Sequence, residues 1–175
     1  MERPRKSVRR HSFQLWPTRG LAPFAARSAS ATEYYVAPAP TGSDANAGTL
    51  DKPFATLQKG ADTAVAGDTV WIRGGTYAIT TPKTSAAGIL FSKSGTSDTK
   101  RINYWAYPGE VPKLDFSNMT LSTSGYTMGV SVTGSWLHFK GLEKCCVPMT
   151  TFSNNGFAVD GGGHNIFENR RLAGS

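Results

Sequence analysis

Short runs in which hydrophobic and polar residues alternate occupy much of the chain after residue 68. Alternation with a period of two is typical of a β-strand that buries one face, so each run predicts a short strand. Gly, Pro, Asn or Asp separates the runs, as expected for turns. The hydrophobic positions assigned to one face are Val70 and Ile72 in 69–73, Ile102, Tyr104 and Ala106 in 102–107, and Val111, Leu114 and Phe116 in 111–116.

One segment has the longer period of a helix. Between Pro53 and Gly67 the hydrophobic residues fall three or four positions apart, which predicts a short amphipathic helix among the strands. Pro53 suits the first helical position, and Gly67 with Asp68 ends the run. Gly60 near the middle weakens such a helix by about 1 kcal/mol relative to Ala. The buried face would consist of Phe54, Leu57, Ala61, Ala64 and Val65.

The segment 129–143, GVSVTGSWLHFKGLE, is echoed further along the chain by 156–170, GFAVDGGGHNIFENR, with one extra position in the later turn. A short strand cannot bury its face alone, whereas stacked copies at a fixed period cover one another. The repeat therefore predicts a parallel β-helix, and a β-sandwich with two similar hairpins is the alternative. In the coil, Val130 and Val132 would lie beneath Phe157 and Val159, and Ser131 would lie beneath Ala158 on the outer face. Asn residues at the turns would bond successive coils: Asn154, Asn155, Asn165 and Asn169.

The net charge of +7 comes mainly from the N-terminal tail, where residues 1–30 hold seven basic side chains and one acidic side chain. Residues 31–175 hold twelve basic and eleven acidic side chains, so we expect no nucleic-acid partner for the folded part. The basic tail 1–31 ends in "ASA" and resembles a degraded secretory signal peptide, which predicts an extracellular or periplasmic protein. An organelle transit peptide and a wrongly assigned start are the alternatives. No run of about 18 apolar residues occurs, so we expect no membrane partner.

Several motifs carry a family resemblance over 33–169. They are "YYVAP" (34–38), "GSD" (42–44), "KPFATLQK" (52–59), "GDTVWIRGGTY" (67–77), "KSGT" (93–96), "AYPGE" (106–110) and "NNGFAV" (154–159). Together they resemble the opening of the right-handed parallel β-helix pectate-lyase superfamily, especially polysaccharide lyase family 9-like proteins. The resemblance implies an all-β fold, a right-handed parallel β-helix of about four coils with an N-terminal capping α-helix.

The resemblance also implies a function. We expect 32–175 to be the N-terminal part of a truncated β-helix domain, because the enzymes of the family continue beyond about four coils. The whole protein would be an extracellular pectate-lyase-like protein that degrades uronate glycans by β-elimination, with acidic polysaccharide such as pectate as partner. The present chain would be inactive by itself. The alternative is a non-catalytic carbohydrate-binding or structural β-helix protein.

Lyases of the resembled type hold Ca²⁺ with clustered Asp residues and use a Lys or Arg as base, so Ca²⁺ is a possible cofactor by resemblance. That Asp pattern is absent from the sequence, which leaves the catalytic residues unknown and no metal site identifiable. Candidate substrate-binding residues are Asp160, Lys140 and His138, each of which is also compatible with an ordinary turn or solvated strand position. Trp71 and Trp105 point outward in the expected strands, where they would stack on sugar rings or pack under loops.

Overall fold

The computed structural model describes residues 30–84, 87–120, 127–145 and 154–168. Most of the basic tail, including the candidate signal peptide, lies outside these residues. The described elements are β1 (Glu33–Val36), α1 (Leu57–Thr63), β2 (Thr69–Ile72), β3 (Gly75–Ala78), β4 (Ala87–Phe91), a 3-10 turn (Asp98–Lys100), β5 (Ile102–Ala106), β6 (Pro112–Asp115), β7 (Thr127–Val132), β8 (Leu137–Lys140), β9 (Glu143–Cys145), β10 (Asn154–Val159) and β11 (Ile166–Glu168).

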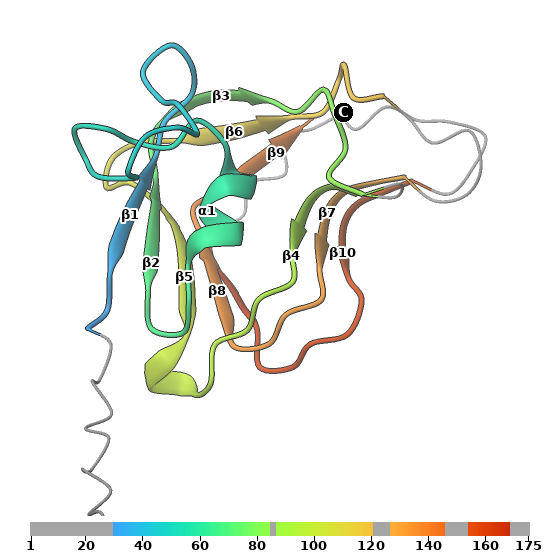
Figure 1. Ribbon diagram of the computed structural model, residues 1–175. Helices are drawn as coiled ribbons and strands as arrows, with labels where there is room; N and C mark the ends of the chain where they lie inside the picture. Colours follow the sequence, from blue (N-terminus) through green and yellow to red (C-terminus); the bar gives the residue numbers. More distant parts are fainter. Residues whose placement is uncertain (1–29, 85–86, 121–126, 146–153, 169–175) are drawn as a thin grey trace, which may run out of the picture.

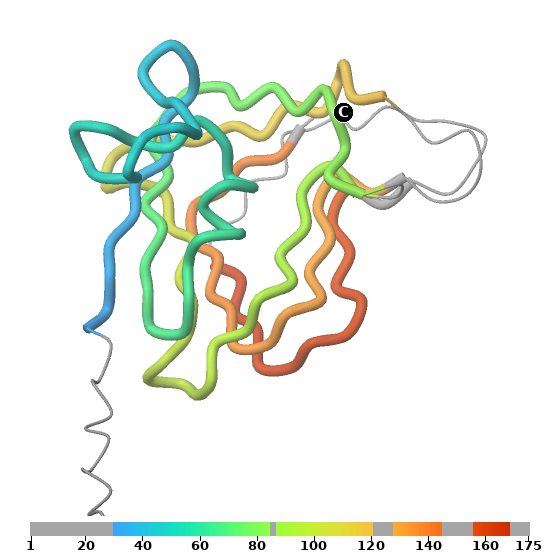
Figure 2. Tube along the Cα trace, viewed as in Figure 1, coloured from blue at the N-terminus to red at the C-terminus, as the bar shows by residue number. Residues whose placement is uncertain are grey.

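The described strands form three sheets in which every strand pair is parallel. Sheet A has the order β1-β2-β5-β8-β11, sheet B the order β3-β6-β9, and sheet C the order β10-β7-β4. Successive coils add strands to the same three sheets, so that β4, β7 and β10 run side by side although they are far apart in sequence (Figures 1 and 2). This is the parallel β-helix that the repeat predicts, and the β-sandwich alternative is wrong.

The core is filled by the inward side chains of the three sheets. On sheet A, Tyr104, Phe139 and Phe167 occupy equivalent positions in successive coils. The Tyr104 and Phe139 rings are stacked at 5.2 Å, and the Phe139 and Phe167 rings at 5.1 Å. Phe91 of sheet C meets both Tyr104 and Phe139 edge-on. Burying each such ring stabilises the fold by about 1.5–3 kcal/mol, so this column contributes strongly to holding the coils together.

The register of the repeat is confirmed. Val130 pairs with Phe157, Val132 with Val159, and Ser131 with Ala158. Ser131 and Ala158, expected on the outer face, are nevertheless both buried, and Val159 at the end of β10 is 47% exposed. Phe139 and Phe167 also pair, although they lie one position further apart in sequence than Val132 and Val159. The turn after β10 contains the extra position, so the strands on both sides of it keep their register.

Of the turn asparagines, Asn165 bonds the coils as expected. Its Oδ1 accepts from the Leu137 N–H, and its Nδ2 donates to the Gly134 carbonyl. The side chains of Asn154 and Asn155, and all of Asn169, lie outside the described residues.

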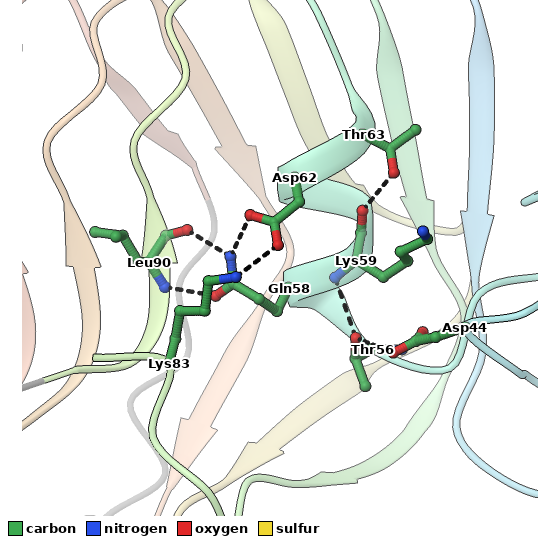
Figure 3. A network of polar contacts seen from close by, with 8 residues as sticks. All are labelled: Asp44, Thr56, Gln58, Lys59, Asp62, Thr63, Lys83 and Leu90. Atoms are coloured by element: carbon green, nitrogen blue, oxygen red, sulfur yellow. Dashed lines mark hydrogen bonds and ion pairs between the residues drawn. The ribbon is translucent and has the colours of Figure 1, made fainter. Parts of the chain in front are cut away.

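The helix starts later than the sequence predicts. Pro53 is not its first residue, because the backbone of Phe54 forms an isolated bridge with Val36 and Thr56 is the N-cap. Asp44 fixes this start, because its carboxylate accepts from the Ala55 N–H and from the Thr56 N–H and hydroxyl. Figure 3 shows Asp44 beside Thr56. The "GSD" motif thus has a structural role at the helix N-terminus.

Most of the expected buried positions are buried. Ala106 at the end of β5 is only partly buried, and two further residues are exposed. Val65 is 50% exposed, since α1 ends at Thr63 and the chain then turns away. Val111 is 58% exposed, because β6 begins at Pro112 and this proline takes the inward position before Leu114. Both expectations were wrong for the same reason, namely that the element boundaries differ from the hydrophobic pattern.

α1 contacts β1, β2 and the outer edge of β4. The Gln58 side-chain amide donates to the Leu90 carbonyl and accepts from the Leu90 N–H, as a neighbouring strand would (Figure 3). Asp62 accepts from the same amide and pairs with Lys83 at 2.8 Å. Within the described residues, no helix is long and apolar enough to cross a membrane.

Candidate functional site

The outer face of sheet A gathers the polar and aromatic side chains that alternate with the buried ones. Tyr35, Trp71, Trp105, Lys140 and Glu168 occupy equivalent positions on the five successive strands of this sheet. Beside this column lie Glu33, Arg73, Tyr107, Glu110 and His138. Two of the three sequence candidates, His138 and Lys140, therefore lie on one face, both on β8.

Aromatic rings form the first part of the face. The Trp71 and Trp105 ring centroids are 5.5 Å apart with an interplanar angle of 68°. Tyr107 is 6.1 Å from Trp71 and 6.3 Å from Tyr35. Glu33 holds one end, because its carboxylate accepts from the Trp71 indole N–H at 3.1 Å and from the Tyr35 hydroxyl at 3.2 Å. These contacts join three coils at the surface and leave the rings half-buried.

Charged side chains form the second part. Glu168 lies 3.5 Å from the Lys140 ammonium and 3.4 Å from His138 Nε2. The His138 contact is longer than a normal N–H···O hydrogen bond, and neither His138 Nε2 nor the Trp105 indole nitrogen has a hydrogen-bond partner among the described residues. Lys140 and Glu168 are 51% and 44% exposed, so their ion pair is weak. The Lys140 ammonium lies 6.0 Å above the Trp105 ring.

Burial lowers the pKa of His138, and the carboxylate of Glu168 only partly offsets this effect. The imidazole is packed edge-on against Trp105, with ring centroids 5.2 Å apart. The neutral form of His138 is therefore favoured in the folded protein.

Arg73 and Glu110 connect two successive coils at the edge of the same face. The guanidinium makes a bidentate pair with the carboxylate, and Glu110 also accepts from the Gly74 N–H. The hydrogen bonds from Arg73 hold the pKa of Glu110 below its usual value. The Arg73 guanidinium also lies 4.6 Å from the Tyr107 ring centroid. Arg73 is thus already engaged by a structural carboxylate.

Asp160 lies elsewhere, at the end of β10 in sheet C. Its side chain is exposed, and its N–H donates to the Val132 carbonyl. No hydrogen bond or ion pair joins it to His138 or Lys140 in the part of the chain that the structure describes. The structure therefore does not combine the three sequence candidates into one site.

The described residues do not fit a calcium site. Ca²⁺ needs six to eight oxygen ligands, usually from several converging carboxylates. Within the described ranges, no group of three or more His, Cys, Asp or Glu side chains could hold a metal ion. Glu33, Glu110 and Glu168 of the outer face instead each bind a different neighbour.

Sequence reasoning missed Glu168, Tyr107 and the Arg73–Glu110 pair. The repeat contains the signal for Glu168, because the match of Phe139 with Phe167 places Glu168 beside Lys140. No sequence pattern indicates the Arg73–Glu110 pair, since it depends on the length of the first coil.

Comparisons with known proteins agree with this architecture. Pectate lyase PEL9 of Emericella nidulans is 40% identical over 85 residues, which are 49% of this chain and 18% of that protein. The solved structure of a rhamnogalacturonan lyase is 34% identical with a TM-score of 0.73, covering 81% of this chain and 36% of the other. The crystal structure of pectate lyase Pel9A is 31% identical with a TM-score of 0.60, covering 81% of this chain and 33% of the other.

The chain thus spans 18% of the curated relative and about a third of each solved chain. A family model matches nearly all of the residues that follow the basic tail, from 34 to 174. Because this match covers well over half of the sequence, the chain belongs to the family described as Pel9A-like, right handed beta helix region.

Proposed function

We propose that this chain is part of an exported protein that binds uronate-containing polysaccharide and degrades it by β-elimination. The observation that carries the proposal is the combined likeness in sequence and fold to a rhamnogalacturonan lyase and to pectate lyase Pel9A, over 81% of this chain in both cases. Both are lyases by name, and pectate is an acidic polysaccharide.

β-Elimination removes the proton next to a uronate carboxylate and then expels the glycosidic oxygen. It requires a positioned base and a cation that neutralises the carboxylate. The only lysine on the outer face of sheet A among the described residues, Lys140, lies beside Glu168 and not beside a cluster of metal-ligating carboxylates. We therefore assign binding of polysaccharide, and not its cleavage, to the described part of this chain. We expect the residues of any calcium site to lie outside the described part of the chain.

The proposal includes a role for α1 as the cap of the first coil. The edge of β4 would otherwise present unpaired N–H and C=O groups to solvent, and open edges favour aggregation. The Gln58 side chain bonds both backbone groups of Leu90, and Leu57, Gly60 and Ala61 form the buried face of the helix. Export is supported by the basic tail with its small-residue "ASA" segment.

The test compares binding with cleavage. The 175-residue chain is incubated with polygalacturonate and with rhamnogalacturonan, with Ca²⁺ or with a chelator, and the ultraviolet absorbance of unsaturated product is followed. Affinity electrophoresis through the same polysaccharides measures binding. We expect retardation by at least one of them and no product. Lack of retardation by both would refute the proposal, and calcium-dependent product would refute the assignment of binding alone.

A further inference from the structure

We infer that the outer face of sheet A binds one acidic sugar ring, with Trp71 and Trp105 against the ring and the Lys140 ammonium at its carboxylate. The inference rests on the proposed function for the class of ligand, a uronate-containing polysaccharide. It locates the contact on a particular face and names the residues that make it.

The aromatic residues on this face form a continuous strip. Tyr35, Trp71 and Trp105 follow one another on adjacent parallel strands, about 4.8 Å apart, and Tyr107 lies beside them. None of them fills the core, whose sheet A column is Tyr104, Phe139 and Phe167 on the opposite side. A contiguous, partly exposed aromatic strip on an otherwise polar surface is a feature of binding sites. A pyranose ring has an apolar face of C–H groups that packs well on such aromatic rings.

The charge at the end of the strip selects an acidic ligand. Lys140 is 51% exposed, lies over Trp105, and has Glu168 as a partner only at 3.5 Å. An exposed pair of this kind contributes about 0–1 kcal/mol, so Lys140 can exchange Glu168 for the carboxylate of a ligand at little cost. Arg73, in contrast, is held by hydrogen bonds to both carboxylate oxygens of Glu110 and is not available. Lys140 is therefore the cation that would take the uronate carboxylate.

The position of Glu33 sets the orientation. It binds the Trp71 indole and the Tyr35 hydroxyl at the end of the strip away from Lys140, and no ion pair within the described residues balances its negative charge. The charge of Glu168 at the other end is balanced by Lys140, so a carboxylate is disfavoured more strongly beside Glu33. The carboxylate of the ligand should thus lie on the β8 side, with the rest of the ring toward β2.

The test measures the affinity of the full chain for oligogalacturonates by isothermal titration. We expect Lys140→Gln and Trp105→Ala each to weaken binding on the order of tenfold. Lys52→Gln is the matched control, because Lys52 is an exposed lysine in the loop before α1 and should leave affinity unchanged. Lys140→Gln carries the test if Trp105→Ala does not fold, since the Lys140 side chain is half in solvent.

Several results would overturn the inference. Unchanged affinity in Lys140→Gln would do so and leave the proposed function intact. Equal weakening in Lys140→Gln and Lys52→Gln would show a diffuse attraction to basic residues. Equal affinity of the wild type for a neutral galactan would show that Lys140 does not select the ligand. If the wild type self-associates and Trp105→Ala does not, the aromatic strip would instead bind a second copy of the chain. A wild type that binds no acidic polysaccharide would count against the proposed function itself.

Discussion

Gly60 lies in the middle of the seven-residue helix α1, where glycine is normally unfavourable. By helix propensity alone, Gly60→Ala should stabilise the protein by about 1 kcal/mol. The packing of the helix leads to the opposite expectation. A Cβ atom at position 60 would lie 2.9 Å from Cγ1 of Val70 and 3.2 Å from Cγ2 of Val36. Both valines are fully buried, on β2 and β1, so neither can move into solvent.

The two effects can be compared in magnitude. Inserting a methyl group into a well-packed core costs about 1–3 kcal/mol. The gain in helix propensity offsets about 1 kcal/mol of this cost. We therefore expect Gly60→Ala to lower the free energy of unfolding by about 1 kcal/mol. The close approach of α1 to sheet A, and not helix propensity, then determines the residue at this position.

A double-mutant cycle in urea tests this reasoning. Val70→Ala removes the methyl group that makes the 2.9 Å contact and leaves space above Gly60. In that background Gly60→Ala should stabilise by about 0.5–1 kcal/mol, because the propensity gain remains and the main clash is gone. The same substitution should thus have opposite signs in the two backgrounds. An increase of the unfolding midpoint by Gly60→Ala in the wild-type background would refute the packing argument.

Three further substitutions test contacts that hold the coils. Glu110→Gln removes the charge that pairs with Arg73, so we expect a loss of about 1–2 kcal/mol at neutral pH in urea unfolding. The pKa of Glu110 in the folded protein is lowered below that of a free Glu, about 4.3. The free energy of unfolding of the wild type should therefore fall as the pH drops below about 4.3 and through the folded pKa. The free energy of unfolding of Glu110→Gln should lack this pH dependence. Asp44→Ala removes the acceptor of three hydrogen bonds at the start of α1 and should cost about 1–2 kcal/mol; an unchanged urea midpoint would contradict this role. The pKa of His138 is lowered in the folded protein, so protonation of this imidazole favours the unfolded state. The wild type should therefore lose stability as the pH falls below about 6.5, the pKa of a free His. His138→Gln should flatten the pH dependence of the melting temperature below that pH.

The strands of sheet A could be predicted well from the sequence because their alternation is regular. Val70, Ile72, Ile102 and Tyr104 are all buried, as the period of two indicates. The helix start could not be predicted, because it depends on a contact between the Asp44 carboxylate and the Ala55 N–H, which are well separated in sequence. Local pattern shows which residues prefer a helix, whereas the tertiary hydrogen bonds decide where it begins.

The motifs behind the family resemblance mainly stabilise the fold. Asp68 of "GDTVWIRGGTY" is buried and accepts from the N–H groups of Thr32 and Val65. Arg73 of the same motif binds Glu110 of "AYPGE" in the next coil. These residues join successive parts of the chain and touch no cluster of catalytic groups within the described residues. Such motifs therefore identify the family and say little about the reaction.

The outer face of sheet A depends on register, which a single repeat does not reveal. Trp71 pairs with Trp105, Trp105 with Lys140, and Lys140 with Glu168, and the first two pairs are more widely separated in sequence than the third. The one repeat visible in the sequence, with its inserted position, predicts only the third pair. The coils differ in length because the loops that connect the strands can vary in length at a small entropic cost. The inward side chains keep the strands in register in spite of this variation. The sequence can thus show that Trp105 and Lys140 both point outward, but it is the core register that makes them neighbours. The inferred binding of an acidic sugar rests on this pairing of a lysine with a tryptophan at the surface.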